Sequence, residues 1–181
     1  GVVVLPKCIG SNWVEALREA IDRDIHNPGP YVHSYDSEDS TGYFHGNLRT
    51  WENDPTFRSF CMDSSLPGVA AALFGSRKVN LLYDQIFVKE PATMVRTRWH
   101  NDQPYWPVQG RQVASFWIAL DHVTTENGAL EFIRGSHISG DWYQPEAFGP
   151  TTGYDAYERN PDYKPIPNIE AEREKYDIVS W

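Results

Sequence analysis

The stretch VNLLYDQIFVKEPATMVRTRWHNDQ, residues 79–103, decides the fold of this chain. It is rich in β-branched and aromatic residues, which favour strands. The turn signal Glu90-Pro91 divides it into two expected strands, 79–88 and 92–99. Further strands are expected, with turn-forming residues between them, at 113–120, 129–133 and 176–181. Short strands at this spacing predict a β-sandwich or barrel.

Helices are expected before these strands. Residues 1–5 predict a short strand, and Ser11 or Asn12 is expected to cap a helix with apolar side chains at helical spacing. Asp54 before a proline predicts a second helix, broken near residues 64–67 and ended by Gly75. Helices followed by strands indicate a mainly β fold with flanking helices, of the α+β class.

The chain length of 181 residues predicts one domain, 1–181. Its expected parts are an N-terminal strand with helices (1–78), sheet strands (79–137 and 176–181) and a long polar loop (138–175). Because a strand that begins near residue 176 needs partners, we expect the native chain to continue past Trp181.

Composition limits the partners. The net charge of −9 disfavours nucleic acid, because no basic patch is present to replace counterions on a phosphate backbone. Two cysteines are too few for a disulfide framework, and no apolar run reaches the roughly 18 residues of a membrane span. These features predict a soluble cytoplasmic protein without nucleic-acid or membrane partners.

The strongest chemical signal is Trp99-His100-Asn101-Asp102. In an extended segment the side chains of residues i and i+2 point to the same face, so His100 and Asp102 can offer a nitrogen and an oxygen to one ion. Two histidines and one carboxylate on one face of an octahedron, with open positions opposite, are the ligands of non-haem Fe(II) oxygenases. The pair alone is unspecific, but the sequence around it adds further motifs.

Those motifs indicate which protein family the stretch from about residue 80 to residue 137 resembles. It resembles the phytanoyl-CoA dioxygenase family, a branch of the Fe(II)/2-oxoglutarate-dependent oxygenases. The matching segments are Trp-His-Asn-Asp-Gln at 99–103, the expected strand that contains Trp117, Glu-Asn-Gly-Ala-Leu at 126–130 and Gly-Ser-His at 135–137. The resemblance implies a cupin-like double-stranded β-helix, or jelly roll, which is incomplete at the C-terminal end of the given sequence.

The resemblance also implies a ligand set. His100 and Asp102 match the first two metal ligands of the family and are the expected catalytic residues. The third ligand, a distal histidine, and the basic residue that pairs with the far carboxylate of 2-oxoglutarate are expected beyond Trp181. His137 is not expected to be a ligand, because its triplet is a structural turn in the family.

Four further positions match less strongly. Gln85 and Trp117 match residues that contact the cosubstrate 2-oxoglutarate; the alternatives are a solvent-facing strand glutamine and plain core packing. Tyr105 and Trp106, just past the ligands, are expected to line the substrate entrance.

The activity implied is hydroxylation of a small organic metabolite with Fe(II), 2-oxoglutarate and O₂, releasing succinate and CO₂. The carboxylate at Asp102 disfavours halogenation, because related halogenases carry a small residue there. Epimerisation, desaturation and ring closure remain open. The alternatives are a non-enzymatic jelly-roll module that binds a sugar or small molecule, and a cupin-type metalloenzyme that does not use 2-oxoglutarate.

The long segment 138–175 predicts a lid that covers the substrate and excludes water, with a mobile surface insertion as the alternative. Its aromatic side chains would line the covered space: Trp142, Tyr143, Phe148, Tyr154, Tyr157 and Tyr163.

Overall fold

The computed structural model of this chain describes residues 1–35, 42–93, 95–146 and 159–181. The contacts divide the chain into two compact units. The helix–sheet unit contains Pro6–Arg96 and Ala114–Phe116, and the motif unit contains Gly1–Leu5, Thr97–Val113 and Trp117–Trp181.

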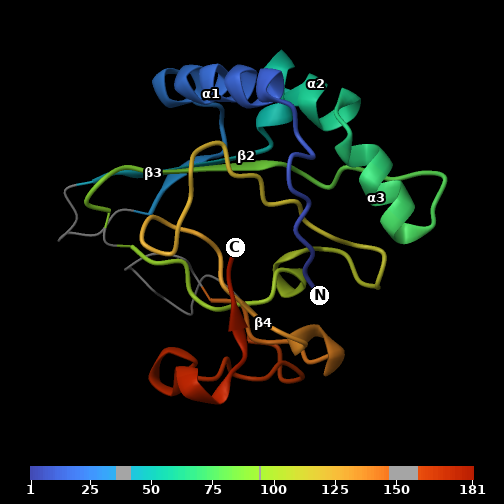
Figure 1. Ribbon diagram of the computed structural model, residues 1–181, viewed down its shortest axis with the longest axis vertical. Coiled ribbons are helices and arrows are strands. Elements are labelled where there is room, and N and C mark those ends of the chain that lie inside the picture. Colours follow the sequence, from blue (N-terminus) through green and yellow to red (C-terminus); the bar gives the residue numbers. More distant parts are fainter. Residues whose placement is uncertain (36–41, 94, 147–158) are drawn as a thin grey trace. The chain divides into compact units, whose positions relative to one another are not determined.

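Three helices belong to the helix–sheet unit (Figure 1). Helix α1 (Ser11–His26) begins directly after Gly10, without a side-chain cap, so the expected Ser11 or Asn12 cap is wrong. The Gly10 carbonyl accepts the first amide bonds instead. Helices α2 (Pro55–Asp63) and α3 (Leu66–Phe74) confirm the expected break, and Gly75 ends α3 in the left-handed conformation with φ 57°.

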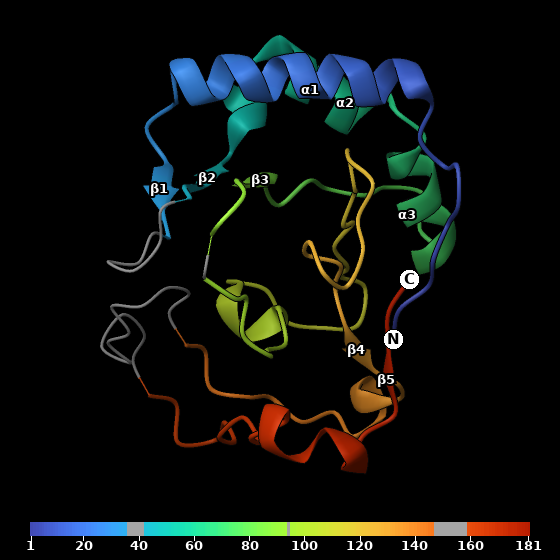
Figure 2. The ribbon, with the colours of Figure 1, turned by 60° about the vertical axis from the view of Figure 1, so that its left-hand side comes forward.

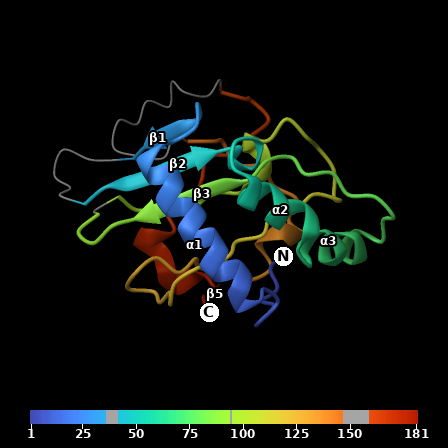
Figure 3. The same ribbon diagram turned by 90° about the horizontal axis from the view of Figure 1, so that it is seen from above.

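The sheet of this unit has three antiparallel strands in the order β1 (Val32–Ser34), β2 (Phe44–Leu48) and β3 (Gln85–Lys89). Figure 3 shows α1 crossing over this sheet. The short 3₁₀ helix η1 (Thr50–Glu52) follows β2.

The core of the helix–sheet unit lies where helix and strand side chains meet. Its buried apolar side chains are Leu17, Ala20, Phe44, Phe57, Phe60 and Ile86. The Trp13 ring on α1 packs edge-on against Phe60 on α2, with ring centroids 5.3 Å apart. Helix α1 is therefore held both by apolar burial and by aromatic contact.

The motif unit is built mainly from turns and short 3₁₀ helices. Strands β4 (Phe132–Ile133) and β5 (Ile178–Val179) pair antiparallel. The 3₁₀ helices are η2 (Gln103–Tyr105), η3 (Ser136–Ile138) and η5 (Glu170–Lys175), and Figure 2 shows β4 and β5 side by side.

Several expected strands are absent from the described residues. Residues 1–5, the described part of 92–99 and residues 113–120 form no ladder, and β3 begins at Gln85 rather than at residue 79. A strand persists only where a neighbouring strand pairs with its backbone groups, and Ala92 has the left-handed φ of 67° typical of a turn. The described residues thus confirm a mixture of helices and antiparallel strands, but they do not build a complete jelly roll.

No helix in the described ranges is both long enough and apolar enough to cross a membrane.

Candidate metal centre

His100 and Asp102 lie in contact within the motif unit. Nε2 of His100 is 3.2 Å from Oδ1 of Asp102. Asp102 has helical backbone angles (φ −70°, ψ −39°) and precedes η2. The two side chains therefore meet, as their spacing predicts, although residues 99–102 form no strand in the structure.

The backbone fixes the orientation of the His100 ring. Nδ1 of His100 lies 2.6 Å from the carbonyl oxygen of Arg98, an acceptor, so Nδ1 carries hydrogen and donates. Nε2, facing Asp102, is then the nitrogen available for a proton or a metal. Burial alone would lower the pKa of His100, but the hydrogen bonds and charge of Asp102 and the Arg98 carbonyl outweigh it and raise the pKa.

This arrangement fits two ligands of a metal ion. Donor atoms in adjacent positions of an octahedral ion, each about 2.1 Å from the metal, are about 3.0 Å apart, and the His100–Asp102 separation is 3.2 Å. The side chains are 24% and 44% exposed, so an ion and a small molecule can reach them. Metal-binding histidines commonly donate their other nitrogen to a carbonyl, as His100 does. In the part of the chain that the structure describes, no cluster of three His, Cys, Asp or Glu side chains completes the set.

Tyr105 borders the same imidazole. Its ring meets the His100 ring edge-on, with centroids 5.7 Å apart and planes at 82°. Its hydroxyl donates to the backbone oxygen of Glu146 and accepts from the backbone nitrogen of Glu146, both at 2.8 Å. Tyr105 thus joins the segment that carries His100 and Asp102 to a residue 41 positions downstream.

Two other residues of the motif bind that segment. The Asn101 amide donates to the Asp141 carbonyl at 3.2 Å and accepts from the Tyr143 backbone nitrogen at 3.4 Å. Arg98 forms an ion pair with the Glu146 carboxylate at 3.1 Å. Residues 141–146 therefore lie along the motif and restrain its side chains.

A charged network anchors Trp99, the residue directly before His100. The Trp99 indole nitrogen donates to Glu170 on η5 at 2.6 Å. Arg173 holds Glu170 and also binds both carboxylate oxygens of Glu131, at 2.6 and 3.1 Å. Because the paired guanidinium and carboxylate have a fixed geometry, this network constrains the backbone that carries His100.

The expected lid segment has organised ends. Tyr143 and Lys164 form a parallel bridge, and the Trp142 and Tyr163 rings lie 5.5 Å apart. The Lys164 ammonium pairs with Asp141 at 2.7 Å. Three of the expected lid aromatics fall outside the described residues: Phe148, Tyr154 and Tyr157.

The remaining expected site residues lie as follows. Gln85 belongs to the helix–sheet unit, where its amide donates to the Tyr35 hydroxyl at 3.5 Å. Trp106 ends η2, and its backbone nitrogen bonds Gln103. Trp117 is 49% exposed.

Sequence reasoning missed the groups that position the pair. The Arg98 carbonyl, Glu146 and Glu170 have no motif of their own in the sequence. Only the two-residue spacing of Arg98 and His100 was a usable signal, because a histidine can bond a carbonyl so close along the chain.

Comparison with known proteins gives the following matches. A sequence model of the family described as Phytanoyl-CoA dioxygenase (PhyH) matches residues 1–179. A phytanoyl-CoA dioxygenase of Arabidopsis thaliana is 29% identical over 89 residues, 49% of this chain and 31% of the relative. A phytanoyl-CoA dioxygenase domain-containing protein 1 homolog of Caenorhabditis briggsae is 28% identical over 85 residues, 46% of this chain and 29% of the relative. The matched part thus spans under a third of each relative's length. No solved structure matches the chain.

Proposed function

Because this chain belongs to the phytanoyl-CoA dioxygenase family, we propose that it is an Fe(II)- and 2-oxoglutarate-dependent oxygenase that hydroxylates a small organic metabolite. His100 and Asp102 are the proposed metal ligands. The jelly roll typical of the family is the proposed fold of the complete catalytic domain.

One observation carries the proposal. With Nδ1 of His100 donating to the Arg98 carbonyl, Nε2 and the Asp102 carboxylate face each other at 3.2 Å as two acceptors. Two facing acceptors need a cation between them, either a proton on the imidazole or a metal ion. A mixed nitrogen and oxygen donor pair suits iron better than it suits a soft thiolate-preferring metal.

Bound iron with 2-oxoglutarate and O₂ would supply the oxidising chemistry, with succinate and CO₂ as by-products. The chain's own residues bind and orient. The Arg98 carbonyl holds the His100 ring, and the Tyr105 ring closes one edge of that imidazole. Glu170 accepts a hydrogen bond from the Trp99 indole and so restrains the backbone directly before His100. Gln85 and Trp117 are proposed cosubstrate contacts, and Tyr105 and Trp106 are proposed to lie at the substrate entrance.

The test measures succinate formed from 2-oxoglutarate by the full native chain, with and without Fe(II). Asp102→Ala removes one proposed ligand. Asp177→Ala, which removes a carboxylate paired with Arg134 on an exposed surface, is the matched control. We expect iron-dependent succinate in the wild type and in the control. Asp102→Ala should form at least about a hundredfold less, because losing even an outer-shell partner of a metal ligand costs about 10–100-fold.

Two results would exclude this function. Metal binding without succinate would favour a cupin-type metalloenzyme. Ligand binding that is indifferent to a chelator would favour the non-enzymatic binding module.

A further inference from the structure

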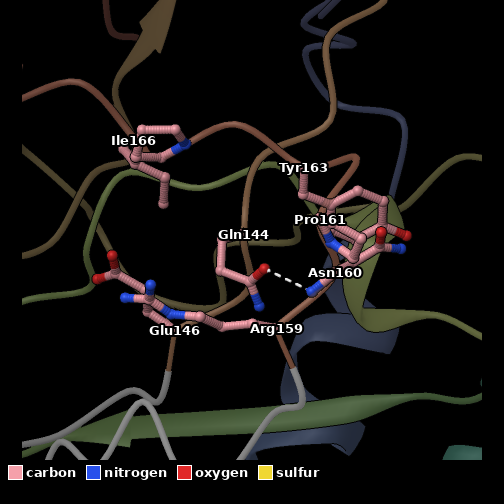
Figure 4. Close-up of a pocket in the computed structure, with 8 residues that line it drawn as sticks. Gln144, Glu146, Arg159, Asn160, Pro161, Tyr163 and Ile166 are labelled. Atoms are coloured by element: carbon pink, nitrogen blue, oxygen red, sulfur yellow. Dashed lines mark hydrogen bonds between the residues drawn. The ribbon is translucent and has the colours of Figure 1, made fainter.

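The backbone of residues 98–105, which carries the proposed metal pair, is held at two places in the motif unit. At the first, the backbone of Glu146 exchanges two hydrogen bonds with the Tyr105 hydroxyl, and the Glu146 side chain lines a cavity (Figure 4). At the second, the Trp99 indole nitrogen donates to Oε1 of Glu170 at 2.6 Å. The second contact reaches further into the unit, because Glu170 belongs to a network of charged side chains.

Arg173, on η5, is the centre of that network. Its Nη1 donates to both carboxylate oxygens of Glu170, at 3.2 and 3.3 Å. The same nitrogen and Nη2 donate to the two oxygens of Glu131, at 3.1 and 2.6 Å. A guanidinium is planar and permanently charged, so it sets the orientation of one carboxylate relative to the other. Oε1 of Glu170 therefore accepts from Arg173 and from the Trp99 indole at once.

Glu131 connects the network to the paired strands of the motif unit. It directly precedes β4, which pairs with β5. On one side of the pair, the Ser180 hydroxyl donates to the Leu130 carbonyl at 2.8 Å. On the other side, the Arg134 backbone nitrogen donates to the Asp177 carbonyl at 2.8 Å. Hydrogen bonds thus hold the chain before and after Glu131, and its carboxylate is a fixed point for the guanidinium.

Trp99 lies where the network can act on the metal pair. The carbonyl oxygen that accepts from Nδ1 of His100, at 2.6 Å, belongs to Arg98. The planar peptide bond keeps this carbonyl in one plane with the Cα atom of Trp99, and the next peptide plane joins the same Cα atom to His100. A fixed Trp99 therefore limits the movement both of the imidazole and of the carbonyl that orients it.

We propose that Arg173 is a positioning residue of the metal pair. Through Glu170 and the Trp99 indole, it holds the backbone that orients the His100 imidazole toward Asp102. A ligand that is already oriented loses less conformational freedom when a metal ion binds, so the network raises the affinity of the site for a divalent cation. This role rests on the proposed function in one respect: it takes His100 and Asp102 as the metal ligands.

The test is a calorimetric titration of the metal-free, full native chain with Co(II), which is more stable in air than Fe(II). Arg173→Gln removes the guanidinium that holds both carboxylates, and Trp99→Phe removes the indole donor but keeps an aromatic ring. Lys175→Gln, which breaks an exposed pair with Glu172 on the same 3₁₀ helix, is the matched control. Wild type and control should bind Co(II) equally. Each test variant should bind it about tenfold more weakly, the lower end of the range for groups that orient a metal ligand.

Two further measurements separate positioning from a general loss of stability. In the Trp99→Phe background, Arg173→Gln should weaken Co(II) binding no further, because both substitutions break the same link. In NMR spectra of the metal-free chain, the Nδ1 proton of His100 should exchange with water faster in both test variants than in Lys175→Gln.

Two results of the titration would overturn the role of Arg173. One is an Arg173→Gln variant that is folded by circular dichroism and binds Co(II) as tightly as the control. The other is a double variant in which the two single losses multiply. A wild type that binds no Co(II) would contradict the metal pair itself. The exchange of the His100 proton then decides on the positioning role alone: faster exchange in the test variants supports it, and equal exchange refutes it.

Discussion

Asp24 on α1 is predicted to be the polar side chain on which the helix–sheet unit depends most. Its carboxylate lies 2.8 Å from Nε2 of His45 and accepts a second hydrogen bond of 2.8 Å from the Asn47 amide, both on β2. The Asp24 and His45 side chains are only 10% and 3% exposed, and Asn47 is buried as well. One carboxylate thus connects the helix to two buried residues of the sheet.

Replacing Asp24 with Ala leaves His45 and Asn47 with buried donors and no acceptor. Each buried group left without its hydrogen-bond partner costs about 1–3 kcal/mol, so the loss of both bonds should cost about 2–6 kcal/mol. Against a total stability of roughly 5–15 kcal/mol, the variant should lose a large part of its unfolding free energy. For a chain of this size, the melting temperature should fall by roughly 4–24 °C.

The assay is urea unfolding followed by circular dichroism, with Asp22→Ala as the matched control. Asp22 lies on the same helix, and it is exposed. A surface substitution of this kind changes stability by less than about 0.5 kcal/mol. Equal midpoints for Asp24→Ala and Asp22→Ala would refute the reasoning, because they would mean that the buried network contributes nothing net.

Three further predictions concern other residues. Tyr105→Phe keeps the ring against His100 but removes both hydrogen bonds to the Glu146 backbone. The substitution should lower the unfolding free energy by about 1–3 kcal/mol and speed hydrogen exchange at the Glu146 backbone amide. An unchanged exchange rate would contradict this contact. Burial alone would raise the pKa of Asp54, but hydrogen bonds from Arg23, Thr56 and Phe57 outweigh it and hold the pKa below its usual 3.8. The ionised Asp54 carboxylate therefore stabilises the fold fully above pH 3.8, and this stabilisation is lost as pH falls through the lower folded-state pKa. In acid titrations, the difference in unfolding free energy between wild type and Asp54→Asn should shrink below pH 3.8. A difference that does not change with pH would contradict the role of Asp54 as a charged helix cap. Burial, with the nearby Asp84 charge, raises the pKa of Cys61 to about 12. At about pH 8, an aromatic disulfide reagent should therefore modify Cys61 in the native Cys8→Ala protein far more slowly than in the urea-unfolded form. Equal modification rates would contradict this prediction.

The part of the fold that the sequence predicts depends on residues close to each helix end. Asp54 before Pro55 and Gly75 after Phe74 act within one helical turn, so the ends of α2 and α3 follow from nearby residues alone. The cap of α1 was misread because Ser11 already has a place inside the helix, and the Gly10 carbonyl receives the first bonds.

The strands are harder to predict, because amino-acid composition indicates a preference for extended backbone but does not identify the strand that would pair with it. Residues 113–120 have the side chains of a strand but form none in the structure, whereas residues 85–89 pair with β2 along their full length. The meeting of His100 and Asp102 follows from their spacing, although the segment that carries them forms no strand.

The surroundings of the candidate centre could not be read from the sequence at all. Trp99 and Glu170 are 71 residues apart, and Tyr105 and Glu146 are 41 residues apart. Such pairs form only after turns bring distant segments together, and no residue-level propensity encodes them.

The central claim is that His100 and Asp102 bind Fe(II) together with 2-oxoglutarate. The most direct test is an anaerobic titration of the full native chain with Fe(II) and 2-oxoglutarate, which monitors the weak visible charge-transfer band of the iron–cosubstrate chelate. The double variant His100→Ala, Asp102→Ala is compared with Asp177→Ala, and circular dichroism confirms that each is folded. The account predicts a band in the wild type and in Asp177→Ala and none in the double variant. A folded wild type without the band, or a double variant that retains it, would contradict the assignment of these two residues.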